Sequence, residues 1–245
     1  MHCLKIILTS VFMLSIIAAC GSGKKAKDMN LKSPEELLSE GNAFYEQGRY
    51  EDALKSYETL LVLHPASDLH VETQLKMAEA YAKLDRFEDQ MNLLLRVLKE
   101  NIIPGYVPRI YLQLGKFYER AALFNPGVVS TDTSDYKKAL TFYERAIRYE
   151  GSDDTYAKAE ALYRQGLVQA KLGNLTQSTL NYETVAYQYS DKPFAILARI
   201  KLKNPSDTSE LSYDETSIKK YMEILGEQPA QPQKEEPQNR EEEFN

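Results

Sequence analysis

The chain has 245 residues, and its 30 lysines and arginines stand against 36 aspartates and glutamates, for a formal net charge of −6. The folded part has no basic stripe of the kind that a phosphate backbone requires, so we expect no nucleic-acid binding. Only Cys3 and Cys20 carry thiols, which excludes a disulfide framework. The length allows a sizeable core, which packing alone has to stabilise.

The N-terminal segment, residues 1–19, has the composition of an export signal. Lys5 precedes an almost wholly apolar run from Ile6 to Ile17, and two alanines then precede Cys20. The run is too short to span a bilayer and ends in small residues, which is typical of a signal peptide. Ile17-Ala18-Ala19-Cys20 resembles the bacterial lipobox, which implies that Cys20 is acylated and begins the mature protein. The alternative is an ordinary secretory signal with a coincidental cysteine.

Residues 20–32 are polar and small, and we expect them to form a flexible leash behind the lipid. No later stretch is apolar for long enough to cross a membrane, so the lipid would be the only anchor. One acyl chain binds a bilayer only marginally, at about 0.8 kcal/mol per buried CH2, so stable anchoring needs more than one chain.

Residues 33–65 have the pattern of two amphipathic helices joined by a turn. The positions that carry the pattern are Leu37, Gly41, Phe44, Gly48, Tyr50, Ala53, Tyr57, Leu60 and Pro65. The apolar and small residues recur at intervals of three and four, which places them on one face of each helix. Gly48 breaks the chain between the helices and Pro65 closes the second helix.

The same pattern recurs farther along the chain. Ala78 follows Gly41 by 37 residues, Gly115 follows Ala78 by the same interval, and Gly166 begins a weaker fourth copy. The spacing resembles the tetratricopeptide (TPR) repeat. The resemblance implies an all-α, TPR-like α-solenoid of antiparallel helix hairpins, with about four repeats and C-terminal capping helices. The alternative is a non-repetitive helical bundle with the same apolar periods.

These patterns divide the chain into segments. We expect a repeat domain over 33–192, with units at 33–65, 70–103, 107–150 and 155–190, then capping helices over 193–226 and a disordered acidic tail over 227–245. The residues expected to shape the repeats are Gly41, Tyr50, Ala53, Pro65, Ala78, Gly115, Ala139 and Gly166. The third unit carries an insertion over 119–135, for which we expect a longer first helix and then a protruding loop.

The residue types needed for catalysis are absent or scattered. His64 and His70 flank a proline turn beside Asp68 and Glu72, without the ligand spacing of a zinc centre. No Gly-x-Ser-x-Gly elbow or nucleophile with a histidine partner is present. We therefore expect no enzyme activity, no metal, no cofactor and no small-molecule substrate.

A stack of hairpins presents a curved surface whose inner face is lined by the first helix of each hairpin. The residues expected there are Asn42, Tyr45, Glu79, Lys83, Arg109, Lys116 and Arg120. Mixed charge with a tyrosine suits an extended or helical peptide from another protein. The alternative is that these side chains only solvate an exposed face.

From about Ser33 to Ala198 the chain resembles the BamD family, the TPR lipoproteins of the outer-membrane β-barrel assembly machinery. The resemblance depends on the lipobox, the early first repeat, the stretched third unit and the segments 134–142 and 154–159. It implies a periplasm-facing scaffold, lipid-anchored in the outer membrane, that recruits partners for membrane-protein assembly. Gly21 after the lipidated cysteine favours the outer membrane in enteric-type sorting.

Two departures keep alternatives open. Glu150-Gly151 replaces the expected repeat-closing proline, and a fifth repeat is barely recognisable. The alternatives are a pilotin-like protein, or a generic envelope adaptor for secretion, pilus or cell-wall machinery. An enzyme would need a catalytic group hidden in the insertion over 119–135.

Lipidation at Cys20 can be tested directly. Cys20→Ala removes the only thiol that acylation could use, so the variant is expected to stay uncleaved or soluble and to incorporate no labelled palmitate. Labelling equal to that of the unmodified chain would refute the lipobox.

Overall fold

The computed structural model describes residues 31–100, 103–123 and 134–227. The signal segment, Cys20, the leash up to residue 30, the middle of the insertion and the tail after residue 227 lie outside the described residues. In the described ranges every regular element is helical, which confirms the all-α expectation. No helix in these ranges has both the length and the apolar character needed to cross a membrane.

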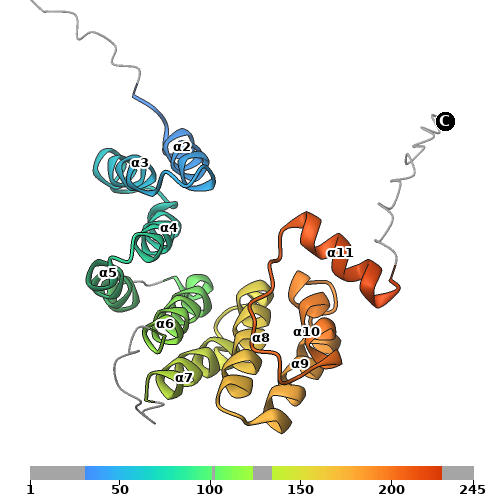
Figure 1. Ribbon diagram of the computed structural model, residues 1–245. Coiled ribbons are helices and arrows are strands. Elements are labelled where there is room, and N and C mark those ends of the chain that lie inside the picture. Colours follow the sequence, from blue (N-terminus) through green and yellow to red (C-terminus); the bar gives the residue numbers. More distant parts are fainter. Residues whose placement is uncertain (1–30, 101–102, 124–133, 228–245) are drawn as a thin grey trace, which may run out of the picture.

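Eight helices form four antiparallel hairpins that follow one another along an arc (Figure 1). The hairpins are α2 (Pro34–Glu46) with α3 (Tyr50–Leu63), α4 (His70–Lys83) with α5 (Phe87–Glu100), α6 (Val107–Ala121) with α7 (Ser134–Arg148), and α8 (Thr155–Lys171) with α9 (Leu175–Gln188). A short 3-10 helix, η2 (Pro104–Tyr106), leads into α6. Helices α10 (Pro193–Lys203) and α11 (Glu215–Leu225) close the C-terminal end.

Local sequence explains where the helices begin and turn. Ser33 caps α2 because its hydroxyl accepts from the Glu36 amide at 3.2 Å, while the Ser33 amide donates to the Glu36 carboxylate at 2.7 Å. The turns of three hairpins need a residue with a left-handed backbone conformation, seven positions after the small residue of the first helix. Gly48 and Gly173 adopt it with φ of 75° and 79°, and Asp85 adopts it with φ of 55°.

The first helix of the third hairpin is only slightly longer than the two first helices before it. Helix α6 spans 15 residues, against 13 in α2 and 14 in α4, while α8 spans 17. It ends at Ala121, six positions after Gly115, where the other first helices end five positions after their small residue. At Ala122, the equivalent of Gly48, φ is −61° rather than positive. Most of the insertion, and with it the expected loop, lies outside the described residues.

A tyrosine ring lies flat on a glycine in three of the hairpins. A Cβ added at Gly41 would lie 2.3 Å from Cε1 of Tyr57, and one at Gly115 would lie 2.3 Å from Cε1 of Tyr143. Gly166 and Tyr182 repeat the contact at 2.6 Å. The second hairpin has Ala78 and Leu94 at the equivalent positions, and Leu94 and the three tyrosines are all fully buried. Where alanine replaces glycine on the first helix, a smaller side chain thus replaces tyrosine on the second.

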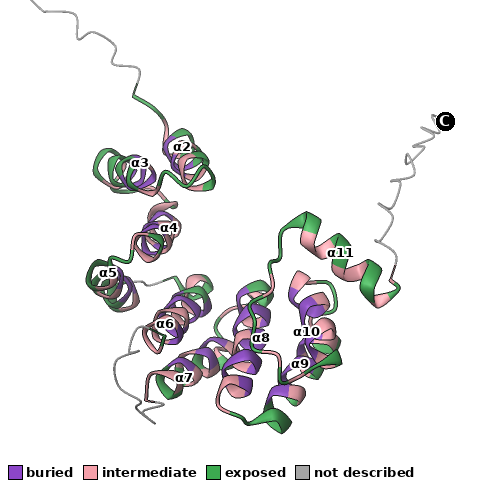
Figure 2. Cartoon of the chain, in the orientation of Figure 1, coloured by how far each residue is buried: buried purple, intermediate pink, exposed green. Residues whose placement is uncertain are grey.

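Buried residues line the surfaces where neighbouring helices meet (Figure 2). Among the residues expected to shape the repeats, Ala53, Ala78 and Ala139 are fully buried, and the three glycines are buried as well. Tyr50 is half-buried, with its ring centroid 5.2 Å from that of Tyr45. Pro65 is exposed in the turn after α3.

Gly41→Ala is expected to destabilise the protein by about 1–3 kcal/mol, because the added methyl group overlaps the buried Tyr57 ring. Gly105→Ala is the matched control, since a Cβ there meets nothing within 4 Å. Adding Tyr57→Leu to Gly41→Ala recreates the Ala–Leu pair of the second hairpin and should restore part of the loss. Thermal unfolding measures all three, and equal melting temperatures for Gly41→Ala and Gly105→Ala would contradict the close contact.

Candidate partner-binding groove

The concave side of the arc holds a groove between the first helices of the hairpins. Two adjoining cavities, of about 500 and 390 Å³, open there and share five lining residues. The shared residues are Lys76, Glu79, Gln113, Lys116 and Tyr213. Helices α4 and α6 therefore form the centre of the groove, with α2 at one side and α8 at the other.

The lining residues occupy a regular stripe on each first helix. In α4 and α6 they lie six and two positions before the small residue and one and five positions after it. The residues are Glu72, Lys76, Glu79 and Lys83 around Ala78, and Arg109, Gln113, Lys116 and Arg120 around Gly115. Steps of four, three and four residues keep the stripe on one helix face. In α8 the first two positions are Glu160 and Arg164.

The structure places most of the expected concave-face residues in this groove. Tyr45, Glu79, Lys83, Arg109, Lys116 and Arg120 each line one or both cavities. Asn42 does not, because it accepts a 2.8 Å hydrogen bond from the Tyr57 hydroxyl and so belongs to the hairpin contact. The sequence reasoning missed Lys76, Gln113, Glu160, Arg164 and Tyr213. Extending the stripe one turn towards the N-terminus of each helix would have found the first four.

Arg120 joins the second and third hairpins. Its guanidinium donates to the Ala82 carbonyl at 2.6 Å and to the Gln90 side chain at 2.5 Å, and it lies 4.9 Å from the centre of the Phe87 ring. Burial lowers the pKa of Arg120. Its guanidinium donors therefore serve mainly to join the two hairpins, rather than to bind a ligand.

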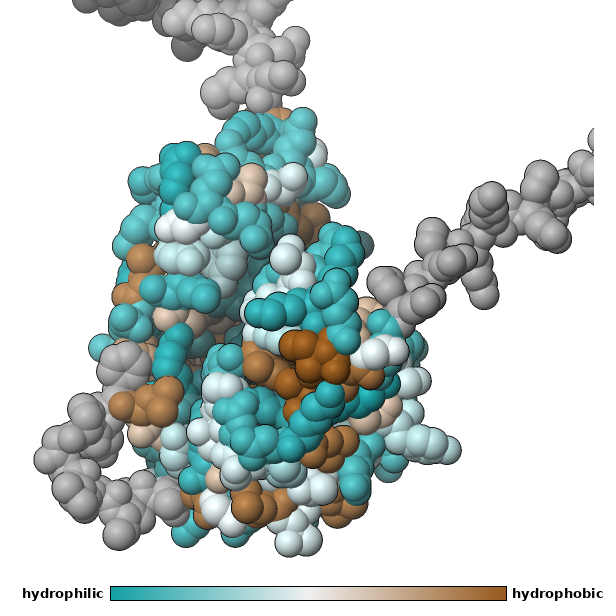
Figure 3. All heavy atoms as spheres, turned by 45° about the vertical axis from the view of Figure 1, so that its right-hand side comes forward, coloured by the Kyte–Doolittle hydropathy of each residue, from teal (hydrophilic) through white to brown (hydrophobic). Residues whose placement is uncertain are grey.

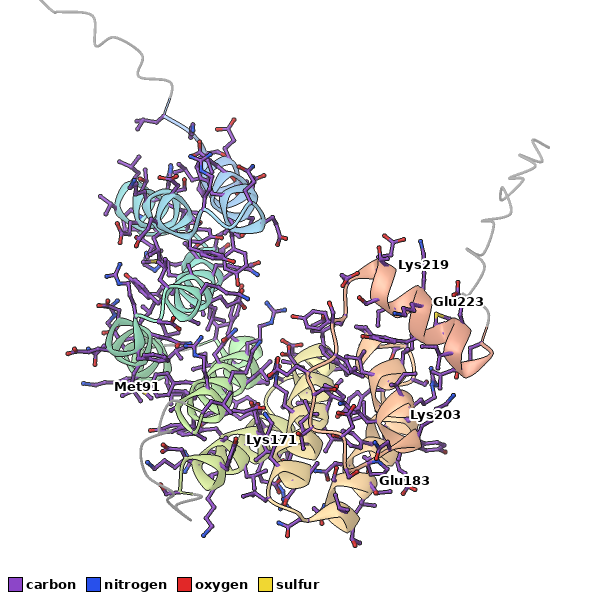
Figure 4. The ribbon with its side chains drawn as sticks, viewed as in Figure 1. Met91, Lys171, Glu183, Lys203, Lys219 and Glu223 are labelled. Atoms are coloured by element: carbon purple, nitrogen blue, oxygen red, sulfur yellow. The ribbon has the colours of Figure 1, made fainter. Side chains whose placement is uncertain are left out.

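A network of buried charges forms the floor of the groove between α6 and α8. Glu160 pairs with Lys116 and with Arg164, both at 3.0 Å. Glu119 pairs with Lys171 at 2.8 Å and with Arg164 at 3.4 Å, so Arg164 connects the two carboxylates. Lys171, labelled in Figure 4, reaches this network from the end of α8.

The network stays ionised at neutral pH. Burial alone would raise the pKa of Glu160, but the positive charges of Lys116 and Arg164 outweigh it and hold that pKa at about 2. Burial likewise opposes ionisation of Glu119, and the neighbouring Arg164 and Lys171 lower its pKa. The Tyr143 hydroxyl donates to Glu119 at 2.7 Å, and burial raises its pKa, so it remains a donor. Three cations thus face two carboxylates, so the network keeps one net positive charge, and Arg164 also approaches the Glu210 carboxylate at 3.7 Å.

Besides Arg120, three charged side chains of the groove have no ionic partner. In the described parts of the chain, Glu46 and Lys83 of the larger cavity and Glu72 of the smaller one form no ion pair. The same ranges contain no group of three His, Cys, Asp or Glu side chains that could hold a metal ion. Within the described residues the groove thus offers one further unpaired cation, Lys83, and two unpaired anions, Glu46 and Glu72, above a floor of paired charges.

The low pKa of Glu160 makes stability depend on pH. The carboxylate contributes stability that is present above its ordinary pKa of 4.5 and is lost as the pH falls towards its folded value of about 2. Glu160→Gln is expected to cost about 3 kcal/mol at pH 7, because it leaves Lys116 and Arg164 buried without their partner. Its melting temperature should then fall less than that of the unmodified chain between about pH 5 and pH 2.5. Glu223→Gln on exposed α11 is the control, and a parallel acid profile for both variants would contradict the network.

Comparison with known proteins agrees with this architecture. Residues 41–85 match a model of the TPR repeat, and residues 131–190 match a second tetratricopeptide repeat model. A search of curated proteins finds no significant match in sequence.

Solved structures share the fold at low sequence identity. A thermophilic TPR protein of Thermus thermophilus superimposes with a TM-score of 0.56 and 18% identity over 79% of this chain and 99% of that chain. TPR-like repeats from a putative kinesin light chain of Podosopora anserina give 0.52 and 11% over 80% of this chain and 95% of that one. Identities this low show the fold alone. The chain thus contains two segments that match tetratricopeptide repeat models and shares the fold of TPR structures.

Proposed function

We propose that this chain is a lipid-anchored, periplasmic scaffold of the bacterial envelope that binds protein partners in its concave groove. The observation that carries the proposal is the groove itself, about 500 Å³ in its larger part and lined by side chains from the first helices of all four hairpins. Tetratricopeptide repeats act in protein–protein interaction through such concave surfaces. The lipobox-like segment ending at Cys20 supports the anchor.

The chemistry of the groove favours a peptide of mixed charge. The face seen in Figure 3 is largely hydrophilic, with hydrophobic residues gathered in a few patches. Tyr45 supplies aromatic surface next to the free Glu46 and Lys83, while Gln113 donates to Glu79 at 2.7 Å at the centre. A purely acidic ligand would be repelled by Glu46 and Glu72, and a purely basic one by Lys83. An extended segment with both signs and an apolar residue fits better.

The resemblance to BamD lipoproteins supports a role in outer-membrane protein assembly, with the chain facing the periplasm from the outer membrane. The second candidate is a pilotin-like protein or a generic envelope adaptor for secretion, pilus or cell-wall machinery. It is favoured by the departure at Glu150-Gly151 from the repeat-closing proline. Capture of partners from solubilised envelope distinguishes the two. Subunits of the β-barrel assembly machinery support the first candidate, and a secretin or peptidoglycan enzymes support the second.

Lys83→Glu is expected to reduce the capture of envelope partners by about fivefold. The substitution replaces the unpaired cation of the larger cavity by an anion, in the same lining as Glu46. Lys99→Glu makes the same charge change on an exposed position of α5, a second helix, and should capture as much as the unmodified chain. The measurement is quantitative mass spectrometry of proteins retained by each immobilised variant. Equal capture by the two variants would place the partner surface elsewhere.

A further inference from the structure

The chain places one of its own segments in the groove. Residues 204–214, which connect α10 to α11 without regular structure, run past α8 towards α11 (Figure 1). Tyr213 of this segment lines both cavities together with residues of α4, α6 and α8. Its ring centroid lies 5.5 Å from that of Phe194, which in turn lies 5.2 Å from that of Tyr156.

The segment is fixed firmly at its two ends. Lys201 of α10 is only 1% exposed. Its ammonium donates to the Asp207 carboxylate at 2.8 Å and to the Ser209 carbonyl at 2.5 Å. A buried ammonium requires such partners, which ties the start of the segment to α10. At the other end Asp214 caps α11 and accepts from the Ser217 amide at 2.9 Å.

The middle of the segment is held by side chains alone: Leu211 packs against the core of α8, α9 and α10, and the Ser212 hydroxyl donates to Asp214. The Glu210 side chain is 62% exposed and approaches Arg164 at 3.7 Å, a contact of little energetic weight. Tyr213 remains 45% exposed. Among the described residues, positions 210–213 form no backbone hydrogen bond with any helix. Release of these four residues breaks side-chain contacts only, while Lys201 and Asp214 keep both ends in place.

We infer that Glu210–Tyr213 is a built-in occupant of a peptide subsite, and that the ligand of this subsite is an extended peptide with a carboxylate three residues before an aromatic side chain. Arg164 receives the carboxylate, and the Tyr156–Phe194 pair receives the ring. This inference rests on the proposed function and names the chemistry that the groove selects. A partner with this pattern competes with Glu210 and Tyr213 for the same contacts.

Competition within one chain weakens binding in a predictable way. A tethered segment acts at a millimolar effective concentration, and the apparent affinity of an outside peptide falls by the fraction of time the subsite is filled. Weakening the tethered segment without changing the groove should therefore raise the affinity for an outside peptide. Substitutions at Glu210 and Tyr213 meet this requirement, because Lys201 keeps its partners Asp207 and Ser209.

The probe is a fluorescein-labelled peptide with the sequence of residues 206–213, Ser-Asp-Thr-Ser-Glu-Leu-Ser-Tyr. Its binding to the full chain is followed by fluorescence anisotropy. The E210Q/Y213A variant is expected to bind it at least tenfold more tightly than the unmodified chain. The matched control is E183Q/Y187A on α9, where Tyr187 is 86% exposed and Glu183 lies on the outer side away from the groove (Figure 4). This control should bind as weakly as the unmodified chain.

Two further measurements keep the outcome clear. A peptide with Gln and Ala at the Glu210 and Tyr213 positions should bind the E210Q/Y213A variant at least tenfold more weakly than the peptide of natural sequence does. The single variant Tyr213→Ala, a change at a half-exposed side chain, should give a smaller gain of about threefold and decides the matter if the double variant melts early. Equal affinities for E210Q/Y213A and E183Q/Y187A, or equal binding of both peptides, would overturn the inference.

Failure of the inference and failure of the proposed function give different results. If the peptide binds the E210Q/Y213A variant tightly but Lys83→Glu leaves capture of envelope partners unchanged, the peptide subsite is supported and the scaffold role is contradicted. If Lys83→Glu abolishes capture while the peptide distinguishes no variant, the scaffold role stands and the occupant is wrong.

Discussion

The contact of a tyrosine ring with a glycine fixes the distance between the two helices in three of the four hairpins. Since an added Cβ would lie within 2.3 to 2.6 Å of the ring, each pair admits one close arrangement. Repetition of this arrangement brings the first helices side by side in equal orientation. Their polar stripes then line up and form a continuous groove. The Tyr143 hydroxyl, bonded to Glu119, connects this packing to the charges of the groove floor.

The floor of the groove shows how many charges can gather without creating a general ion-binding site. Lys116, Arg164 and Lys171 face Glu119 and Glu160, and each carboxylate has two cationic partners. Such a network stabilises one arrangement of α6 against α8 and keeps one excess positive charge beside Arg164. Selectivity then comes from the few groups above the floor, which include Lys83, Glu46 and the rings near Tyr213.

The repeat pattern in the sequence predicted the helical hairpins, because small and aromatic residues must recur wherever helices approach closely. It also predicted six of the residues that line the groove, since helical periodicity alone places them on one face. Asn42 could not be distinguished in this way, because its partner Tyr57 lies on the neighbouring helix. Tyr213 left no signal, since it enters the groove from a segment without periodicity. The sequence did not show how the extra residues of the third unit divide between helix and loop, because a stretched repeat carries no periodic signal for either; α6 gains one residue over α4.

Lys201 has a consequence for how the C-terminal end can vary. Its ammonium lies in the interior, where the Asp207 carboxylate neutralises its charge and Ser209 accepts two of its hydrogen bonds. Deletions between α10 and Ser209 would leave a positive charge without partners in an apolar surrounding. The first six residues of the connector, 204–209, are thus not excess length. They solvate one amine, and the residues after them are free of that constraint.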